Sequence, residues 1–495
     1  MSEIRVTYSG LISFIAGLVT LGTGLVFTII VTRSLSQLDY GTWGLITSLF
    51  VYGVLASEII NFWTVRDVAR GKKVGKLSLV SSSSLSSIGI CIYLVIALLV
   101  APESSVEINF LIIAAILIPM QFLRKASTGI NLGWKPQLLG YGSIISGIVS
   151  VPLALFLIYF LDWSIIGIVF SLAIAEGANI IFQVVCAREK IKAKIDFAIL
   201  KRWFKFSWVP LYPKISNLLV MSDVIVFSLI TGSVIGVSYH SAALVIATLV
   251  GYAAAISASV YPKLLSGDKG KIITRNLTNF FYFAILLVFL ATAFAKPGLF
   301  ILNPIYEIAV LVVIFSTFRI LFFYLTNICE SFLIGVENVD NESKSNFKDY
   351  MKSKLFFLPT LRLIQYAVYI VVLTIVLVSL NNSTETIELV VYWSIIAMIF
   401  QIPLVLYLLY AVKQTFPLKS EIKSIAKYIF AGLVSFALVY FLIENFLTYS
   451  EVISEFLPQV VLLALLGVSM YALITYAIDK PTRDLIKAAI LEIKK

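Results

Sequence analysis

The sequence predicts an all-α, polytopic membrane protein with about fourteen transmembrane helices. Hydrophobic residues make up 60% of the 495 residues, charged residues make up only 13%, and the mean hydropathy is +0.99. Soluble domains are about 45–50% apolar and about 25% charged. The apolar stretches reach the ~20 residues that a helix needs to cross a bilayer. They are continuous rather than alternating, which favours helices over the strands of a barrel.

Fourteen apolar stretches are long enough to span a membrane. The first exceeds the 7–15 residues of a signal-peptide core and is followed by no cleavage pattern, so we expect it to be a retained span. The predicted spans are 9–31, 40–62, 77–101, 106–123, 137–160, 164–187, 208–231, 235–262, 277–296, 305–335, 356–380, 387–411, 425–446 and 458–478.

The basic residues alternate between successive loops. With the N-terminus in the cytoplasm, most of the 38 Lys and Arg residues fall on the cytoplasmic side, including Arg124 and Lys125. The outer loops hold Arg33 and Lys296 and are otherwise acidic. This positive-inside pattern predicts a plasma-membrane protein with both termini in the cytoplasm. It also accounts for the net charge of +11 without nucleic acid as a partner.

Motifs for metal, nucleotide or disulfide chemistry are missing from the sequence. Cys91, Cys186 and Cys329 lie in apolar runs, and His240 is the single histidine. No Cys-x-x-Cys, His-Glu-x-x-His or Walker A spacing occurs. We therefore expect no metal site, no cofactor and no catalytic residues.

The spans divide into two halves and a C-terminal pair. The basic, apolar-interleaved segment 188–206 reads as a helix lying at the cytoplasmic interface. We predict a six-helix bundle over 1–187, this linker helix, a second six-helix bundle over 207–411, and two additional spans with a cytoplasmic tail over 412–495.

A short repeat supports two pseudo-symmetric bundles. The turns between spans one and two and between spans seven and eight share four residues at one offset, and a repeat in the same orientation is parallel. The matching pairs are Thr32/Thr231, Ser34/Ser233, Tyr40/Tyr239 and Leu45/Leu244.

The same turns carry a family resemblance. Span one ends in Thr32-Arg-Ser-Leu, span two begins at Asp39-Tyr-Gly41 and ends in Thr64-Val-Arg-Asp-Val-Ala69, and span eight ends in Val260-Tyr-Pro-Lys-Leu264. Span seven carries Pro210 and Ser222-Asp223. These motifs resemble the Wzx-type polysaccharide-biosynthesis flippases of the MOP (multidrug/oligosaccharidyl-lipid/polysaccharide) exporter superfamily. One position departs: His240 stands where the first half has Gly41.

The resemblance implies two six-helix bundles in a V, as in MATE-like proteins, with two further helices. It implies that a polyprenyl- or dolichyl-phosphate- or diphosphate-linked oligosaccharide moves from the cytoplasmic to the outer leaflet by alternating access, with possible coupling to H⁺ or Na⁺. Arg66 matches a family position that would face the mouth of the cavity. Arg66 and its neighbour Asp67 are equally well read as an anchor at the cytoplasmic end of span two.

Charged residues inside the spans are the remaining binding candidates. Each costs ~2.5–3.5 kcal/mol to insert, so it normally faces a cavity or a partner. Lys214 could hold a phosphate while Asp223 closes a pair. It could instead form an ion pair with another span or reach the cytoplasmic edge. Arg319 and Glu330 share a helix face and could line a cavity or pair two helices. Arg362, with Gln365, Tyr366 and Tyr369, forms a polar stripe that could line the substrate path or a helix–helix seam.

Two other functions stay open. A cation-coupled multidrug or metabolite exporter of the same superfamily would use acidic residues in its cavity. Those counted inside the spans are Glu58, Glu176, Asp223 and Glu330, against the basic Lys214, Arg319 and Arg362. A membrane-embedded glycosyltransferase or polysaccharide polymerase would need large outer loops, which this sequence lacks. Either Glu58 or Glu176 could take a coupling ion.

Overall fold

The structure is a computed structural model that describes residues 6–192, 195–254, 269–334, 351, 353–416 and 422–483. The regular elements of these residues are all helical. By their packing, the Cα atoms divide into two compact units, which are described separately. Unit 1 comprises Met1–Ser238 and Thr374–Asn381, and unit 2 comprises Tyr239–Leu373 and Asn382–Lys495.

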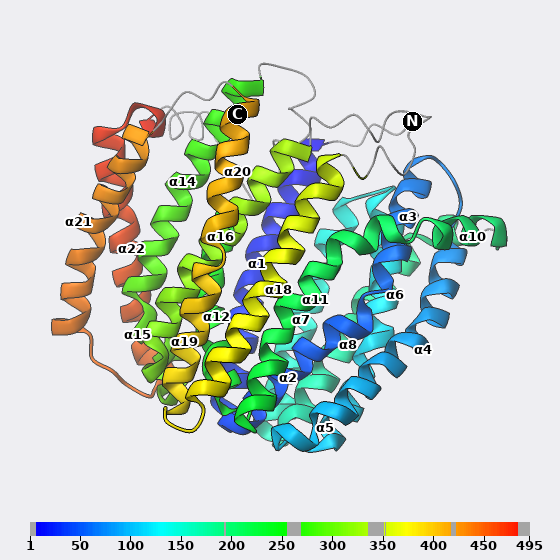
Figure 1. The fold of residues 1–495 in the computed structure, drawn as a ribbon, viewed down its shortest axis with the longest axis horizontal. Coiled ribbons are helices and arrows are strands. Elements are labelled where there is room, and N and C mark those ends of the chain that lie inside the picture. Colours follow the sequence, from blue (N-terminus) through cyan, green and yellow to red (C-terminus); the bar gives the residue numbers. More distant parts are fainter. Residues whose placement is uncertain are drawn as a thin grey trace. The chain divides into compact units, whose positions relative to one another are not determined.

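Unit 1 holds the first eleven α-helices (Figure 1). Helix α7 packs against α1 and α8, and α6 packs against α3, α4 and α8. The short α10 lies across the direction of α3 (Figure 1). The helices are α1 (Val6–Ser34), α2 (Gln37–Val54), α3 (Ser57–Ala69), α4 (Gly75–Val100), η1 (Pro102–Ser104), α5 (Ile108–Ala114), α6 (Leu117–Leu132), α7 (Gln137–Ala154), η2 (Leu155–Phe160), α8 (Ser164–Cys186), α9 (Arg188–Ile191), α10 (Phe197–Lys205) and α11 (Trp208–Thr231).

Unit 2 is built around α16, which packs against α14, α19 and α20. Its last two helices, α21 and α22, pack against each other, and α21 packs against α14 (Figure 1). The first residues of α12 and the last of α18 are assigned to unit 1. The helices are α12 (Ile235–Ala247), η3 (Thr248–Ala254), α14 (Lys269–Ala293), α15 (Ala295–Leu302), η5 (Pro304–Ala309), α16 (Val310–Ile334), α18 (Lys354–Leu380), α19 (Thr386–Ile399), α20 (Ile402–Thr415), α21 (Ile422–Phe446) and α22 (Ile453–Ile478).

Long apolar helices confirm the predicted fold class. Within the described residues, twelve helical segments are long and apolar enough to cross a membrane. The pair α2 and α3 forms a further span bent by 57°, and Val19–Ser34 of α1 is a shorter apolar helix. Together these segments correspond to the fourteen predicted spans.

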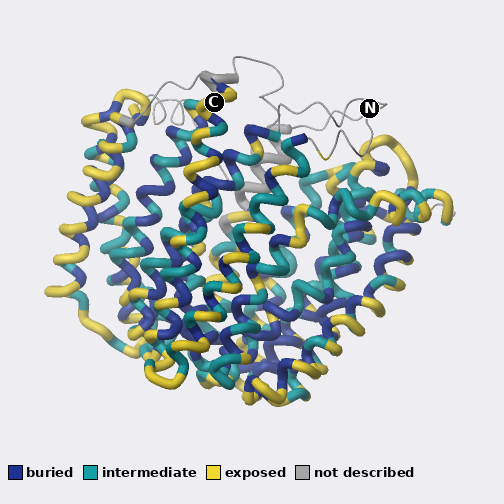
Figure 2. Tube along the Cα trace, in the orientation of Figure 1, coloured by how far each residue is buried: buried dark blue, intermediate teal, exposed yellow. Residues whose placement is uncertain are grey.

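The outward faces of these helices are apolar, as lipid requires. In α4, Val95 and Leu99 are 57% and 69% exposed, and in α18, Val371 and Ile375 are 58% and 62% exposed. Figure 2 shows exposed positions recurring along such helices. Water would not stabilise so much exposed hydrocarbon, whereas lipid tails do not penalise it. The chain is therefore a multi-pass membrane protein.

Two boundaries differ from those expected. The span predicted over 106–123 continues to Leu132, which places Arg124 and Lys125 inside α6 rather than in a loop. The predicted interfacial segment 188–206 contains two helices, α9 and α10.

The predicted span 235–262 is described only to Ala254, and the predicted tail only to residue 483. The division into bundles at 187, 206 and 411 stays a prediction.

The residues of the first turn motif shape the start of α2. The backbone N–H of Asp39 donates to Ser36 Oγ at 3.1 Å, which caps the helix. The Asp39 carboxylate accepts from Ser164 Oγ at 2.9 Å, tying α2 to the start of α8. A Cβ atom at Gly41 would lie 2.0 Å from the carbonyl oxygen of Val234, so only glycine permits this approach.

Candidate functional site

Asp67 is the buried end of a clasp between α3 and α10. Its side chain is 1% exposed and accepts a hydrogen bond from Trp203 Nε1 at 2.9 Å. Arg202 pairs with the same carboxylate, and Lys72 Nζ lies 3.4 Å from its other oxygen. Arg66 is exposed and stacks over the Phe62 ring at 4.1 Å. Arg66 and Asp67, which the sequence analysis treats together, therefore have different surroundings. Asp67 holds α10 of the linker segment against α3.

A bend in the second span places Glu58 next to two lysines. The helix is interrupted between Val54 and Ser57, and Glu58 lies in the first turn of α3. Lys125 Nζ of α6 donates to Glu58 Oε1 at 2.7 Å. Lys214 of α11 also acts electrostatically on Glu58, and its side chain is exposed. Lys214 therefore acts on an acid of a different helix, Glu58.

Asp223 lies deeper in α11 and is 3% exposed. Its Oδ1 accepts from the backbone N–H of Val224 at 2.8 Å. The surrounding part of α11 packs on α2, where Tyr52 donates to the carbonyl of Leu218 at 2.8 Å. Asp223 is therefore held at a packed helix contact within unit 1.

A second charged pair continues into a chain of amides. Arg124 of α6 lies 3.6 Å from Glu176 of α8, and its Nε donates to Gln121 Oε1 at 2.9 Å. Asn179 donates to Glu176 at 3.5 Å, and Gln183 donates to Asn179 at 2.7 Å. This network gives unit 1 a polar interior inside predicted membrane spans. The i, i+3 spacing of Glu176 and Asn179 indicates part of it, whereas Arg124 comes from another helix.

Unit 2 contains a largely buried ion pair between α16 and α18 whose two residues are partly exposed. Arg362 Nη2 lies 2.9 Å from Glu330 Oε2, and the two side chains are 12% and 16% exposed. The same nitrogen donates to Asn327 Oδ1 at 2.7 Å. The acid that pairs with Arg362 is therefore Glu330, the residue predicted to share a helix face with Arg319.

The rest of the polar stripe on α18 makes helix–helix hydrogen bonds. Gln365 donates to the carbonyl of Phe400 at 2.6 Å, and Gln401 donates to the Tyr366 hydroxyl at 3.3 Å. Trp393 Nε1 donates to the Tyr369 hydroxyl at 2.9 Å. These are the contacts of a seam that joins α18 to α19 and α20.

His240 is buried at the position where the first half has Gly41. It is 3% exposed and stacks on Trp393 of α19, with ring centroids 3.9 Å apart and planes 13° apart. Arg319 of α16 acts on it electrostatically. The departure in the repeat has a local cause: the neighbour here is an aromatic ring, whereas at Gly41 it is a backbone carbonyl.

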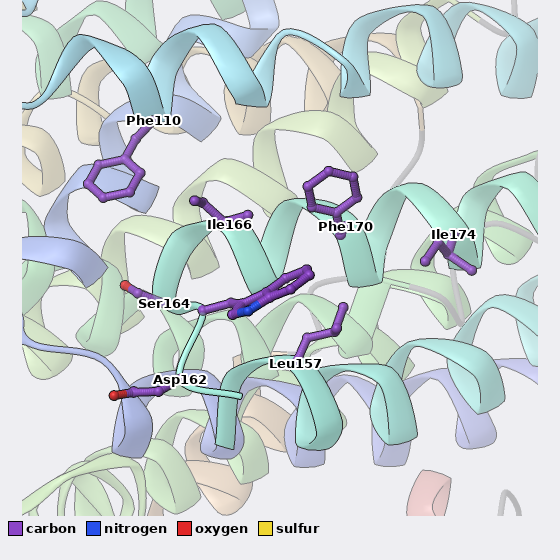
Figure 3. Close-up of a pocket in the computed structure, with 8 residues that line it drawn as sticks. Phe110, Leu157, Asp162, Ser164, Ile166, Phe170 and Ile174 are labelled. Atoms are coloured by element: carbon purple, nitrogen blue, oxygen red, sulfur yellow. The ribbon is translucent and has the colours of Figure 1, made fainter. Parts of the chain in front are cut away.

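Described residues of unit 1 line a small hollow and an open groove. One has a volume of about 240 Å³ and lies between α2, α6 and α8, with Glu176 and Gln121 in its lining. The other is an open groove of about 800 Å³ beside α8. In the groove, Phe110, Ile166, Phe170 and Ile174 form an apolar row, with Asp162 and Ser164 together at one end (Figure 3). The smaller hollow is the one that meets the charged network.

Comparisons with known proteins identify the fold. Neither the search of family models nor that of curated proteins finds a match to this sequence. Among solved structures, the chain is similar to lipid II flippase MurJ in an inward closed conformation. The TM-score is 0.66 at 17% identity, covering 96% of this chain and 100% of that one.

The chain is also similar to a multidrug resistance MATE family transporter of the MOP superfamily in an inward-facing conformation. The TM-score is 0.58 at 15% identity, covering 80% of this chain and 95% of the other. An outward-facing MATE structure gives a TM-score of 0.51 at 15% identity. The chain therefore has the fold that these MOP-superfamily transporters and MurJ share.

Proposed function

We propose that this protein is a flippase for a lipid-linked oligosaccharide. It would move a glycan attached to a polyprenyl or dolichyl phosphate or diphosphate from the cytoplasmic to the outer leaflet of the plasma membrane, by alternating access, with its termini in the cytoplasm. The observation that carries the proposal is the likeness to a lipid II flippase over 96% of this chain and 100% of that one. The inward-facing MATE likeness covers 80% of this chain.

The charges inside the spans support an anionic substrate. The extended α6 adds Arg124 and Lys125 to Lys214, Arg319 and Arg362, so five basic residues stand against the four acidic ones. Three of the acids pair with three of these bases, Glu58 with Lys125, Glu176 with Arg124, and Glu330 with Arg362, so the excess of positive charge is one. Arginine suits a phosphate because its planar fork binds two oxygens.

A cation exporter is the second candidate, because the MATE structures share the fold. Such a protein needs an acidic group that is available to a cationic substrate or a coupling ion. Glu58 and Glu176 lie inside spans, but each is already neutralised by a neighbouring base. Coupling to H⁺ or Na⁺ through either acid would require that pair to open during transport.

A deletion strain tests the proposal. We expect lipid-linked oligosaccharide to accumulate in the cytoplasmic leaflet, where an external glycosidase cannot reach it, and surface glycan to disappear. Re-expression of the intact chain should end the accumulation and restore the surface glycan. Unchanged lipid-linked sugars together with new sensitivity to cationic compounds would support the exporter instead.

A further inference from the structure

Apolar and polar side chains both line the 240 Å³ hollow in unit 1. Trp43 and Phe50 of α2 and Met120 of α6 supply apolar surface. Thr47 of α2, Gln121 of α6 and Glu176 of α8 supply the polar groups. Helix α6 packs against α2 and α8, so the site is built entirely within this unit.

The size of the hollow limits what it can hold. A water molecule takes about 30 Å³ of the liquid, so 240 Å³ is too large for one or two ordered waters. It is also smaller than the roughly 300–1,000 Å³ of sites for drug-sized ligands. A single ring bearing hydroxyl groups matches this size, whereas a complete oligosaccharide does not.

The negative charge of Glu176 in the lining is balanced by a neighbouring arginine. Glu176 lies 3.6 Å from Arg124, so the carboxylate does not present a net negative charge to a ligand. The Arg124 guanidinium would repel a cation, and the Glu176 carboxylate would repel an anion. This balance favours a neutral polar ligand over either ion.

The hydrogen-bonding groups that remain include both donors and acceptors. Gln121 Oε1 accepts from Arg124, and Thr47 Oγ1 donates to the carbonyl of Gly44 at 2.8 Å. Within the described residues, this leaves the Gln121 amide nitrogen as a donor and Glu176 Oε1 as an acceptor. A sugar hydroxyl both donates and accepts, so a pair of neighbouring hydroxyls can use both groups.

The aromatic lining suits the apolar face of a sugar ring. One face of a pyranose is a row of C–H bonds, which carry partial positive charge. An indole face carries the negative part of its quadrupole, so Trp43 attracts such a row and shields it from water. Phe50 and Met120 extend the apolar surface.

We infer that this hollow is a carbohydrate subsite that holds one neutral sugar ring between Trp43 and the Gln121–Glu176 pair. The inference rests on the proposed function and deepens it. Unit 1 would recognise the glycan itself, independently of the residues that bind the phosphate. The site would then discriminate a sugar-bearing carrier from the bare carrier lipid.

The test uses the full chain in nanodiscs and saturation-transfer difference NMR with a panel of methyl glycosides. Losing one hydrogen bond should weaken binding about two- to tenfold in Gln121→Leu. Trp43→Ala should weaken binding at least as much, and Trp43→Phe should restore most of it. Trp163→Ala is the matched control, since Trp163 lines the other groove and is 44% exposed.

Wild-type protein that binds none of the glycosides would overturn the inference. Equal losses in Trp43→Ala and Trp163→Ala would also overturn it, as would binding of tetraphenylphosphonium at Trp43 in place of glycosides. Monodisperse elution of each variant shows that it is folded, and Gln121→Leu keeps the aromatic lining intact if Trp43→Ala fails to fold.

Transport in liposomes separates this inference from the proposed function. If lipid-linked glycan is moved and the Trp43 and Gln121 variants move it as well as wild type, the subsite is wrong and the flippase stands. If wild type binds glycosides at Trp43 but moves no lipid-linked glycan, the flippase is wrong and the subsite stands. We expect both variants to lose preference for glycan-bearing lipid over bare polyprenyl phosphate.

Discussion

Replacing Arg362 by alanine would leave the Glu330 carboxylate inside the membrane without its ion partner. The two groups lie 2.9 Å apart, with side chains 12% and 16% exposed, so solvent screens them little. Asn327 would lose its donor as well. Breaking a buried pair from one side typically costs 3–5 kcal/mol, and the residual exposure reduces our expectation for Arg362→Ala to about 2–4 kcal/mol.

A double-mutant cycle isolates the contribution of the pair. Glu330→Gln should cost less, about 1–2 kcal/mol, because Arg362 keeps its bond to Asn327. The double variant Arg362→Ala/Glu330→Gln should be more stable than the sum of the two losses predicts, with a coupling of about 1–3 kcal/mol.

The assay is unfolding of purified protein by SDS in mixed micelles, followed by circular dichroism. A coupling energy below about 0.5 kcal/mol would mean that the pair does not join α16 to α18. Full stability of Arg362→Ala with complete loss of transport would also refute the claim that Arg362 stabilises the contact between α16 and α18. It would show that Arg362 serves the substrate rather than the seam.

Three further predictions address other parts of the chain. Asp67→Asn should release α10, destabilise the protein by about 1–2 kcal/mol, and speed hydrogen exchange in that helix. The pKa of Asp479, just after α22, is lowered because hydrogen bonds, including one from Ser424, outweigh the effect of burial. Its stabilising contribution should therefore be complete above about pH 4 and be lost as the pH falls further. Thermal melts recorded over a range of pH should show this dependence in the wild type and not in Asp479→Asn. Gly41→Ala should destabilise by at least about 1–3 kcal/mol because its Cβ meets Val234, whereas Gly22→Ala, in open space, should melt like wild type.

Hydrophobicity and loop charge were sufficient to predict the helical fold. Each span is a local property of some twenty residues, and the segments predicted over 137–160 and 208–231 match α7–η2 and α11 within the described chain. The prediction failed at α6, where charge was taken to end the span. Arg124 and Lys125 remain in the helix because Glu176 and Glu58, from other helices, compensate them.

The partners of the candidate residues could not be predicted in the same way. Asp67 meets Trp203, which lies 136 positions later in the sequence, and Arg362 meets Glu330 across two helices. Such contacts depend on how helices pack, and that packing leaves no periodic signal in the sequence. The spacing of Arg362, Gln365, Tyr366 and Tyr369 did indicate one polar face, because an α-helix brings i, i+3, i+4 and i+7 together.

The most direct test of the flippase account uses purified protein in liposomes that contain a fluorescent polyprenyl-diphosphate oligosaccharide. A membrane-impermeant glycosidase added outside cleaves only the glycan in the outer leaflet. If the protein is a flippase, the protected inner-leaflet fraction will disappear at a rate proportional to the amount of protein, while protein-free liposomes keep it. A protected fraction that persists in liposomes that accumulate tetraphenylphosphonium would contradict the account.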